Sequence, residues 1–285
     1  MKIWDRENKT LIEEKEYGKK SLEFLYNTVV GRILLKTIFA SRWFSKVQGL
    51  WQKTIFSKRK IKKFIKEYKI DMSPYKGQKF SSFEHFFTRK RDIENNSRKT
   101  DLVSIADAKL LVKDIDENTR LNIKNSSYSI EEIIGKKLVT KIYKGGTCLI
   151  YRLAVDDYHR YQYLDSGKEL FWNHIKGKLH TVRPIASKYH VYSTNSRDVT
   201  MLATKNFGDV IQIEVGAMLI GKIHNFHLKE FNKLDEKGYF GYGGSTIILL
   251  FEKGKIVVDN DIIENSKNDI ETKVKIGMKI GHKGE

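Results

Sequence analysis

The spacing of apolar residues changes near residue 100, and this change limits what the chain can fold into. Before that point, apolar residues at 34/35, 38/39, 43, 47 and 50/51 recur with the period of an α-helix, which gives one apolar and aromatic face. After it, short apolar runs are separated by Gly, Asp and Asn, a pattern typical of short strands. The predicted strands are 102–105, 109–112, 138–143, 147–153, 178–184, 189–193, 199–203, 210–214, 217–223, 246–251 and 255–258.

These two patterns predict an α+β protein. Residues 1–98 are expected to form a helical, membrane-associating region that contains basic amphipathic helices. Residues 99–285 are expected to form a β-rich catalytic domain of short, mainly antiparallel strands. Within the first region, Ser81 or Ser82 is suited to cap a short helix that carries Phe83, Phe86 and Phe87.

The helical region is strongly basic. From Phe24 to Lys66 there is no Asp or Glu, while eleven residues are Lys or Arg. Basic helices with Trp43 and Trp51 on their apolar face are typical of proteins that lie on anionic membranes. The alternatives are a helix packed on its own domain with solvated lysines, and a nucleic-acid-binding protein, for which no recognisable motif is present. The net charge of +18 also favours an anionic partner.

Several features bear on location and metals. No apolar run reaches the roughly 18 residues that a membrane-spanning helix needs. The segment Met1–Glu7 is charged, unlike a signal peptide, and the lone Cys148 fits a reducing compartment. We therefore expect a peripheral protein on the cytoplasmic face of the cell membrane. His224 and His227 lack an evident third ligand nearby, so no metal site is expected.

The Gly243-Gly244-Ser245 turn allows two interpretations. It lies between an aromatic stretch and the apolar run Thr246–Phe251, so it can be an ordinary hairpin turn whose glycines supply positive φ angles. Alternatively, a serine held in a strained turn can attack the carbonyl group before it. Local pattern alone favours the hairpin, and the rest of the chain decides between the two.

Five segments, taken in order, resemble the phosphatidylserine decarboxylase family, whose members use a pyruvoyl group. The two most specific are Asp157-Tyr158-His159-Arg160, which matches the family's DYHR motif, and Gly243-Gly244-Ser245-Thr246, which matches its GGST processing motif. The other three are Phe86-Phe87-Thr88-Arg89-Lys90, Ala106-Asp107, and Val215-Gly216-Ala217 followed by Ile220-Gly221.

The resemblance implies a self-processing enzyme. Ser245 would attack the Gly244 carbonyl, and the resulting ester would be eliminated to give a β chain of residues 1–244 and an α chain of residues 245–285 that begins with a pyruvoyl group. That group would form a Schiff base with phosphatidylserine, release CO2 and leave phosphatidylethanolamine. The implied partners are phosphatidylserine and an anionic membrane surface, with the two fragments staying associated. A homodimer is left open, and no nucleic acid, metal or dissociable cofactor is expected.

One position departs from the family pattern. The family relay for self-cleavage is Asp-His-Ser, and Asp107 and Ser245 match its first and last members. The relay histidine is replaced by Gln162, which cannot accept and return a proton at neutral pH. Either His180 or His159, whose family role is closer to substrate protonation, supplies the imidazole. If it is His180, His180→Ala is predicted to block cleavage while Gln162→Ala does not. Otherwise the protein is a processing-deficient, non-catalytic relative that binds anionic lipid.

Overall fold

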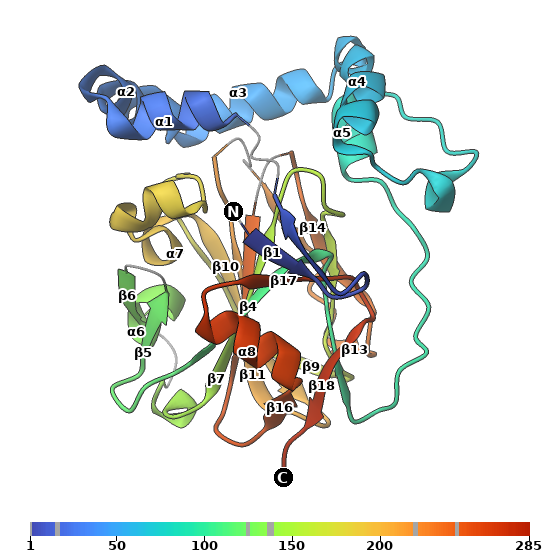
Figure 1. The fold of residues 1–285 in the computed structure, drawn as a ribbon, viewed down its shortest axis with the longest axis vertical. Coiled ribbons are helices and arrows are strands. Elements are labelled where there is room, and N and C mark those ends of the chain that lie inside the picture. The colour runs from blue at the N-terminus through green and yellow to red at the C-terminus, as the bar shows by residue number, and fades with distance from the viewer. Residues whose placement is uncertain (1, 15–17, 124–125, 136–139, 219–221, 243–244) are drawn as a thin grey trace.

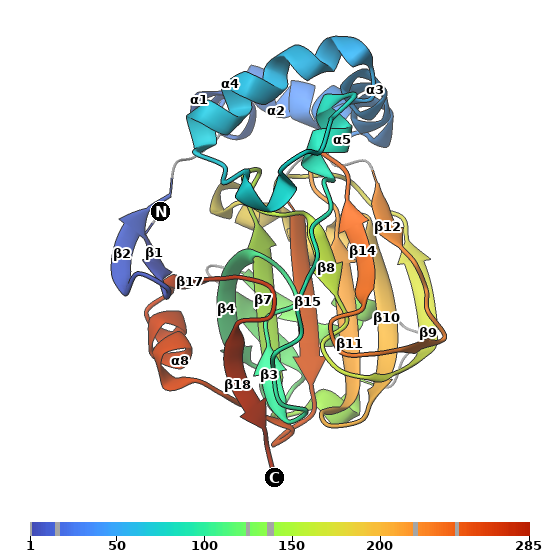
Figure 2. The same ribbon diagram turned by 90° about the vertical axis from the view of Figure 1, so that its right-hand side faces the viewer.

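The computed structural model describes residues 2–14, 18–123, 126–135, 140–218, 222–242 and 245–285. It contains a large central sheet, smaller elements on both faces of that sheet, and a layer of helices across one end (Figures 1 and 2). The predicted α+β architecture with mainly antiparallel strands is therefore confirmed.

The central sheet has ten strands in the order β13-β9-β10-β11-β15-β7-β4-β17-β1-β2. Every neighbouring pair is antiparallel except β1 with β17, which is parallel. The strands are β1 (Lys2–Asp5), β2 (Thr10–Glu13), β4 (Ala108–Asp114), β7 (Thr147–Leu153), β9 (Gly167–Ile175), β10 (Arg197–Thr204), β11 (Gly208–Val215), β13 (Glu230–Phe231), β15 (Ser245–Phe251) and β17 (Glu271–Val274). Residues 2–13, which the sequence assigns to the helical region, thus join the sheet of the β-rich domain.

Two smaller sheets and one helix cover the first face of the central sheet. They are β12 (Ile223–Asn225), β14 (Glu236–Phe240) and β8 (Arg160–Gln162); β16 (Ile256–Val258), β18 (Lys279–Lys283) and β3 (Asp101–Val103); and α8 (Asn260–Lys267). Alternate residues of β15, such as Ile247 and Leu249, share one buried cluster with Tyr161 of β8 and Phe240 of β14. This alternation decides which side chains of β15 face the layer that contains β8 and β14.

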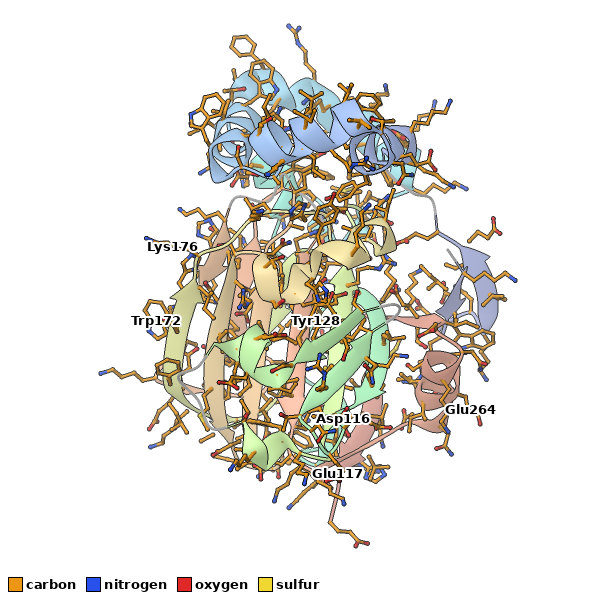
Figure 3. All side chains as sticks on the ribbon, turned by 90° about the vertical axis from the view of Figure 1, so that its left-hand side faces the viewer. Asp116, Glu117, Tyr128, Trp172, Lys176 and Glu264 are labelled. Atoms are coloured by element: carbon orange, nitrogen blue, oxygen red, sulfur yellow. The ribbon has the colours of Figure 1, made fainter. Side chains whose placement is uncertain are left out.

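The second face packs against a separate cluster that includes Ile248 and Leu250 of β15. Figure 3 views the molecule from this side, with Tyr128 of the small hairpin over the sheet. The elements here are β5 (Arg120–Ile123), β6 (Ser126–Ser129), α6 (Ile130–Ile134), η4 (Lys141–Tyr143), η5 (Pro184–Tyr189) and α7 (Val191–Thr194).

The helices at the end of the sheet all precede residue 90. They are α1 (Lys19–Asn27), α2 (Val29–Leu34), the π-helical η1 (Leu35–Phe39), α3 (Arg42–Gln52), η2 (Ile55–Lys58), α4 (Arg59–Tyr68), η3 (Ser73–Tyr75) and α5 (Phe83–Phe87). Ser82 caps α5 by accepting a hydrogen bond from the His85 backbone N–H at 3.1 Å, as predicted. Ile61 and Phe64 of α4 pack against the three phenylalanines of α5 in a third buried cluster.

Several strand predictions were wrong. Residues 189–193 end η5 and begin α7, and residues 178–184 contribute a single bridge, Lys178 to Asn195, before η5 begins. Of the segments 138–143 and 217–223, residues 138–139 and 219–221 lie outside the described residues; the rest contains η4 and only the first residue of β12. The strand β9 was not predicted because its nine residues alternate between half-buried and exposed without a sustained apolar run.

Candidate functional site

Ser245 is the first residue of β15, which lies between β11 and β7 in the middle of the sheet. It pairs with Leu153 of β7, and the alternation of the strand places its side chain on the same face as Ile247. The Ser245 side chain is fully buried, and its Oγ atom has no hydrogen-bond partner among the described residues. Gly244, the other half of the predicted cleavage site, lies outside the described residues. A buried hydroxyl without a protein partner is costly, which marks this position as a candidate reactive site.

His159 approaches the same region from the layer over the first face. The side chain is fully buried, and its Nδ1 lies 2.9 Å from the Asp157 backbone oxygen. Because that oxygen is an acceptor, Nδ1 carries the hydrogen and Nε2 is the nitrogen with the basic lone pair. The ring centroid lies 4.1 Å from that of Phe87, which is 5.2 Å from the ring of Tyr242, three residues before Ser245. Aromatic packing thus places His159 beside the segment that leads to Ser245.

The other residues of the DYHR segment hold it in place. Asp157 Oδ2 accepts hydrogen bonds from the Ala154 backbone N–H at 2.7 Å and from Lys109 Nζ at 2.6 Å. Burial raises the pKa of Asp157 to about 6, although the Lys109 ammonium opposes this rise. Arg160 Nε donates to the backbone oxygens of Thr88 and Arg89 at 2.9 and 3.1 Å. The DYHR segment is therefore tied directly to the phenylalanine-rich segment.

Asp107 immediately precedes β4, whose neighbour β7 separates it from β15. Its two carboxylate oxygens accept hydrogen bonds from Arg91 Nη2 at 2.8 and 2.9 Å, and Oδ1 also accepts one from the Ile276 backbone N–H at 2.9 Å. Arg91 in turn stacks on the ring of Tyr158, with its guanidinium carbon 4.5 Å from the ring centroid. The structure therefore joins Asp107 to the DYHR segment through Arg91, a residue that sequence reasoning missed because an isolated arginine carries no motif.

Gln162 lies at the end of β8 and is buried. Its backbone N–H donates to the Ile105 oxygen at 3.0 Å, which brings β8 beside the Ala106-Asp107 segment. The side-chain Oε1 is buried and has no hydrogen-bond partner within the described part of the chain. The position expected for the relay base thus lies next to the segment that carries Asp107, but an amide occupies it.

His180 lies in a different environment. Its ring stacks on Tyr189 at 4.5 Å, and its Nδ1 shares a hydrogen bond of 3.3 Å with Tyr26 OH, which also accepts the Thr181 N–H. Tyr26 and Tyr189 belong to the buried cluster of the second face, whereas Ser245 faces the first. Burial lowers the pKa of His180 to about 4, so the imidazole is neutral at pH 7. Across the described residues none of these contacts involves Ser245, and a role in self-cleavage stays a prediction.

A cavity of about 470 Å³ lies between the helical layer and this end of the sheet. Its wall includes Leu153, the pairing partner of Ser245, and Tyr242, so it opens beside the start of β15. The lining residues are Gly18, Ser21, Leu22, Leu25, Phe39, Arg152, Leu153, Ala154, Val155, Thr181, Val182, Arg183, Ala217, Met218 and Tyr242. A mainly apolar cavity of this size suits an amphipathic small molecule.

Comparison with known proteins gives this arrangement its context. The family model described as phosphatidylserine decarboxylase matches residues 80–282. A relative from Clostridium acetobutylicum, named phosphatidylserine decarboxylase proenzyme 2, is 51% identical over 98% of this chain and 97% of its own length. The chain belongs to the phosphatidylserine decarboxylase family. Relatives named phosphatidylserine decarboxylase proenzyme from Clostridium botulinum and Clostridium beijerinckii are 40% and 39% identical over 99% of this chain and 99% of their own lengths.

Among the described residues, no group of three or more His, Cys, Asp or Glu side chains is arranged to hold a metal ion. Within the same residues, no helix is both long enough and apolar enough to cross a membrane.

The outer surface of the helical layer is nevertheless apolar. Trp43 is 70% exposed and Trp51 is 48% exposed. Other large apolar side chains exposed on this layer are Phe24, Val29, Val30, Ile33, Ile38, Val47, Leu50, Ile55 and Phe56. An apolar patch of this extent on a protein surface marks an interaction site.

Proposed function

We propose that the chain is a phosphatidylserine decarboxylase proenzyme that cleaves itself between Gly244 and Ser245. The observation that carries this proposal is the buried Ser245 hydroxyl at the start of β15, which has no hydrogen-bond partner among the described residues and lies beside an apolar cavity, in a chain that belongs to this family. The family comparison favours the enzyme over the alternative of a non-catalytic lipid-binding relative.

In the proposed self-cleavage, Ser245 Oγ attacks the Gly244 carbonyl carbon and the C–N bond breaks, so that an ester replaces the amide. Removal of the Ser245 α-proton expels the Gly244 carboxylate, and the resulting dehydroalanine loses ammonia to water. We assign the proton transfers to His159, since its Nε2 carries the basic lone pair and its ring packs toward the segment before Ser245. Asp107, held by Arg91, fixes the neighbouring DYHR segment through Tyr158.

The surroundings of Ser245 suit the pyruvoyl group that would form from this serine. The site is buried and lined by apolar residues, which suits a compact α-keto group better than a charged amine. When formed, this group supplies an electrophilic carbonyl that acts as an electron sink. The chain's own residues exclude water through the Phe87 and Tyr242 rings, and His159 holds a proton at this site.

We also propose that the helical layer rests on an anionic membrane, on the cytoplasmic face of the cell. Exposed Trp43 and Trp51 would enter the lipid interface, and the basic residues between Phe24 and Lys66 would meet anionic headgroups. The cavity is lined by Leu22 and Leu25 of this layer and by Leu153, the pairing partner of Ser245, so a lipid headgroup would have a short path to Ser245. A homodimer stays a prediction.

Mass spectrometry of the purified chain tests the proposal. Two fragments that meet at Gly244-Ser245 are expected, and the smaller one should lack a free α-amine. Incubation with phosphatidylserine vesicles should release CO2 and phosphatidylethanolamine, whereas the Ser245→Ala variant should stay intact and inactive. A wild-type chain that remains whole after long incubation and yields no phosphatidylethanolamine would refute the proposal.

A further inference from the structure

A second hollow lies in the helical layer, apart from the cavity beside Ser245. Its volume is about 560 Å³, and it is lined by residues of η2 and α4 and by Phe80, which precedes α5. None of its lining residues lines the cavity beside Ser245, whose wall in this layer comes from Gly18, α1 and η1. We call this second hollow the α4 groove. It is a separate place for a ligand, and the proposed decarboxylation does not use it.

The α4 groove has an apolar wall that continues onto the outer surface of the layer. Ile61 is 7% exposed and belongs to the buried cluster that contains the phenylalanines of α5. The ring of Phe80 lies 5.5 Å from that of Phe86, measured between centroids. Ile55 and Phe56 also line the groove, and they are among the exposed apolar side chains of the helical layer. The groove therefore opens onto the surface that would enter a lipid interface.

Three cations line the same groove: Lys58, Arg59 and Lys62. All three are exposed, and within the described part of the chain none of their side chains has a hydrogen bond or an ion pair. The one acidic residue of α4, Glu67, does not line the groove. The groove thus combines apolar side chains with positive charge that no carboxylate of its own lining offsets.

We propose that the α4 groove binds an anionic membrane phospholipid that is not the substrate, and that this lipid holds the enzyme on the bilayer. The inference rests on the proposed membrane placement and decarboxylase function, and it adds a second lipid site to them. Ammonium and guanidinium groups form charge-assisted hydrogen bonds with phosphate oxygens. The exposed Ile55 and Phe56 favour a lipid over a soluble anion, because only the lipid also supplies an apolar part that these side chains can contact.

The reaction itself gives such a site a purpose. Phosphatidylserine carries a net negative charge at pH 7, because its phosphate and carboxylate outnumber its ammonium group. Loss of CO2, with uptake of a proton at the α-carbon, gives phosphatidylethanolamine, which is neutral overall. Each turnover therefore removes negative charge from the surface that attracts this chain of net charge +18. An anionic lipid that is not consumed would keep the enzyme bound as its substrate runs out.

The test measures sedimentation of the purified protein with phosphatidylcholine vesicles that contain a minority of phosphatidylglycerol. Phosphatidylglycerol is anionic but has no amine, so it cannot be the substrate, and vesicles of phosphatidylcholine alone give the baseline. The variant is Lys58→Gln/Lys62→Gln. The matched control is Lys60→Gln/Lys63→Gln, because these two exposed lysines of α4 remove the same charge but do not line the groove.

We expect Lys58→Gln/Lys62→Gln to weaken binding to phosphatidylglycerol vesicles by roughly tenfold or more, and the control pair to weaken it by less than about threefold. On vesicles with a small fraction of phosphatidylserine, added phosphatidylglycerol should prolong decarboxylation by wild type and by the control, but not by Lys58→Gln/Lys62→Gln. Turnover of dihexanoyl phosphatidylserine below its micelle concentration needs no vesicle, so it should be the same for all three proteins.

Equal losses for the two double variants would overturn the inference, because the layer would then respond only to its total charge. Binding of Lys58→Gln/Lys62→Gln as tight as that of wild type would also overturn it, as would a loss of the same size on vesicles of phosphatidylcholine alone. Failure of the proposed function looks different. The wild-type chain would then show neither cleavage nor CO2 release, while its binding to phosphatidylglycerol vesicles would be unaffected.

Discussion

The buried pair Lys237–Glu214 offers the sharpest test of how the site is supported. Both side chains are completely buried, and Lys237 Nζ lies 3.0 Å from Glu214 Oε1. Two further hydrogen bonds, to Thr200 Oγ1 at 3.1 Å and Asn225 Oδ1 at 3.0 Å, use all three ammonium protons. Lys237 lies on β14, which leads to Ser245, and Glu214 lies on β11, beside β15. The pair therefore pins the strand before the proposed cut to the strand beside it.

Lys237→Met should leave the Glu214 carboxylate buried without its cation. Removing one member of a buried pair costs about 3–5 kcal/mol, whereas neutralising both members costs far less. We therefore expect Lys237→Met to lower the free energy of unfolding by several kcal/mol. The double variant Lys237→Met/Glu214→Gln should recover most of that loss. The Gln212 and Asn225 amides donate to different oxygens of Glu214 at 3.0 and 3.1 Å, so the glutamine keeps an acceptor oxygen for one of them.

The assay is urea unfolding in a Ser245→Ala background, which keeps the chain whole. The free energy of unfolding is expected to fall by about 2–3 kcal/mol per M urea, so Lys237→Met should lower the urea midpoint of unfolding by roughly 1–2 M. Burial already raises the pKa of Glu214, and losing Lys237 should raise it further. A raised carboxyl pKa favours the protonated folded state, so the loss of stability should be full at a pH well above the folded pKa of Glu214 and shrink as the pH falls through it.

The exposed pair Lys168–Glu230, whose side chains are 67% and 73% exposed, is the control, and Lys168→Met should leave the midpoint unchanged. A Lys237→Met variant as stable as wild type would refute this reasoning. So would a double variant as unstable as the single one, since the loss would then come from packing and not from a stranded charge.

Three further predictions follow from the described contacts. His159→Ala should abolish self-cleavage, while His180→Phe, which keeps an aromatic ring on Tyr189, should still be cut. A gel of each variant shows whether the chain is cut, and the reverse outcome would restore His180 as the base. Because burial lowers the pKa of His180 to about 4, the stability that this side chain contributes is present above pH 6.5 and lost as the pH falls toward 4. The thermal midpoint of His180→Phe should therefore depend less on pH in this window than that of wild type. A pH profile identical to that of wild type would contradict the burial argument. Trp43→Ala and Trp51→Ala should each weaken sedimentation with phosphatidylserine vesicles by roughly tenfold, while Trp172→Ala, on β9 next to the edge strand β13 (Figure 3), should not. Equal losses for all three variants would deny the helical layer a special role in binding.

The elements that could be predicted from the sequence are those that depend on a local pattern of neighbouring residues. The strands β7 and β15 are nearly continuous apolar runs, as expected of strands covered on both faces, and β10 and β11 contain shorter apolar segments. The Ser82 cap was predictable because capping depends on a few neighbouring residues. The four residues Val191–Thr194 have strand-forming composition but form α7, where buried Val191 and Tyr192 pack into the second-face cluster; tertiary packing overrode local preference there.

The rest of the site depends on contacts between distant segments, which no local pattern encodes. The parallel partner of β1 is β17, with Ile3 opposite Glu271, so two short polar strands could not be recognised from residues 2–13 alone. Arg91 and Asp107, or Lys237 and Glu214, likewise gain meaning only once the fold joins them. Motifs could point to candidate reactive residues, whereas no motif marks the residues that hold them.

The sheet order explains how a chain cut at this site can remain one molecule. A cut before Ser245 would leave β15, β16, α8, β17 and β18 in the smaller fragment. β15 lies between β11 and β7, and β17 lies between β4 and β1, so strands of the larger fragment flank both. Separating the fragments would break five strand pairs, including β18 with β3, and expose the fully buried β15, a change close to global unfolding. Cleavage would therefore create a new chain end beside His159 without loosening the sheet that positions it.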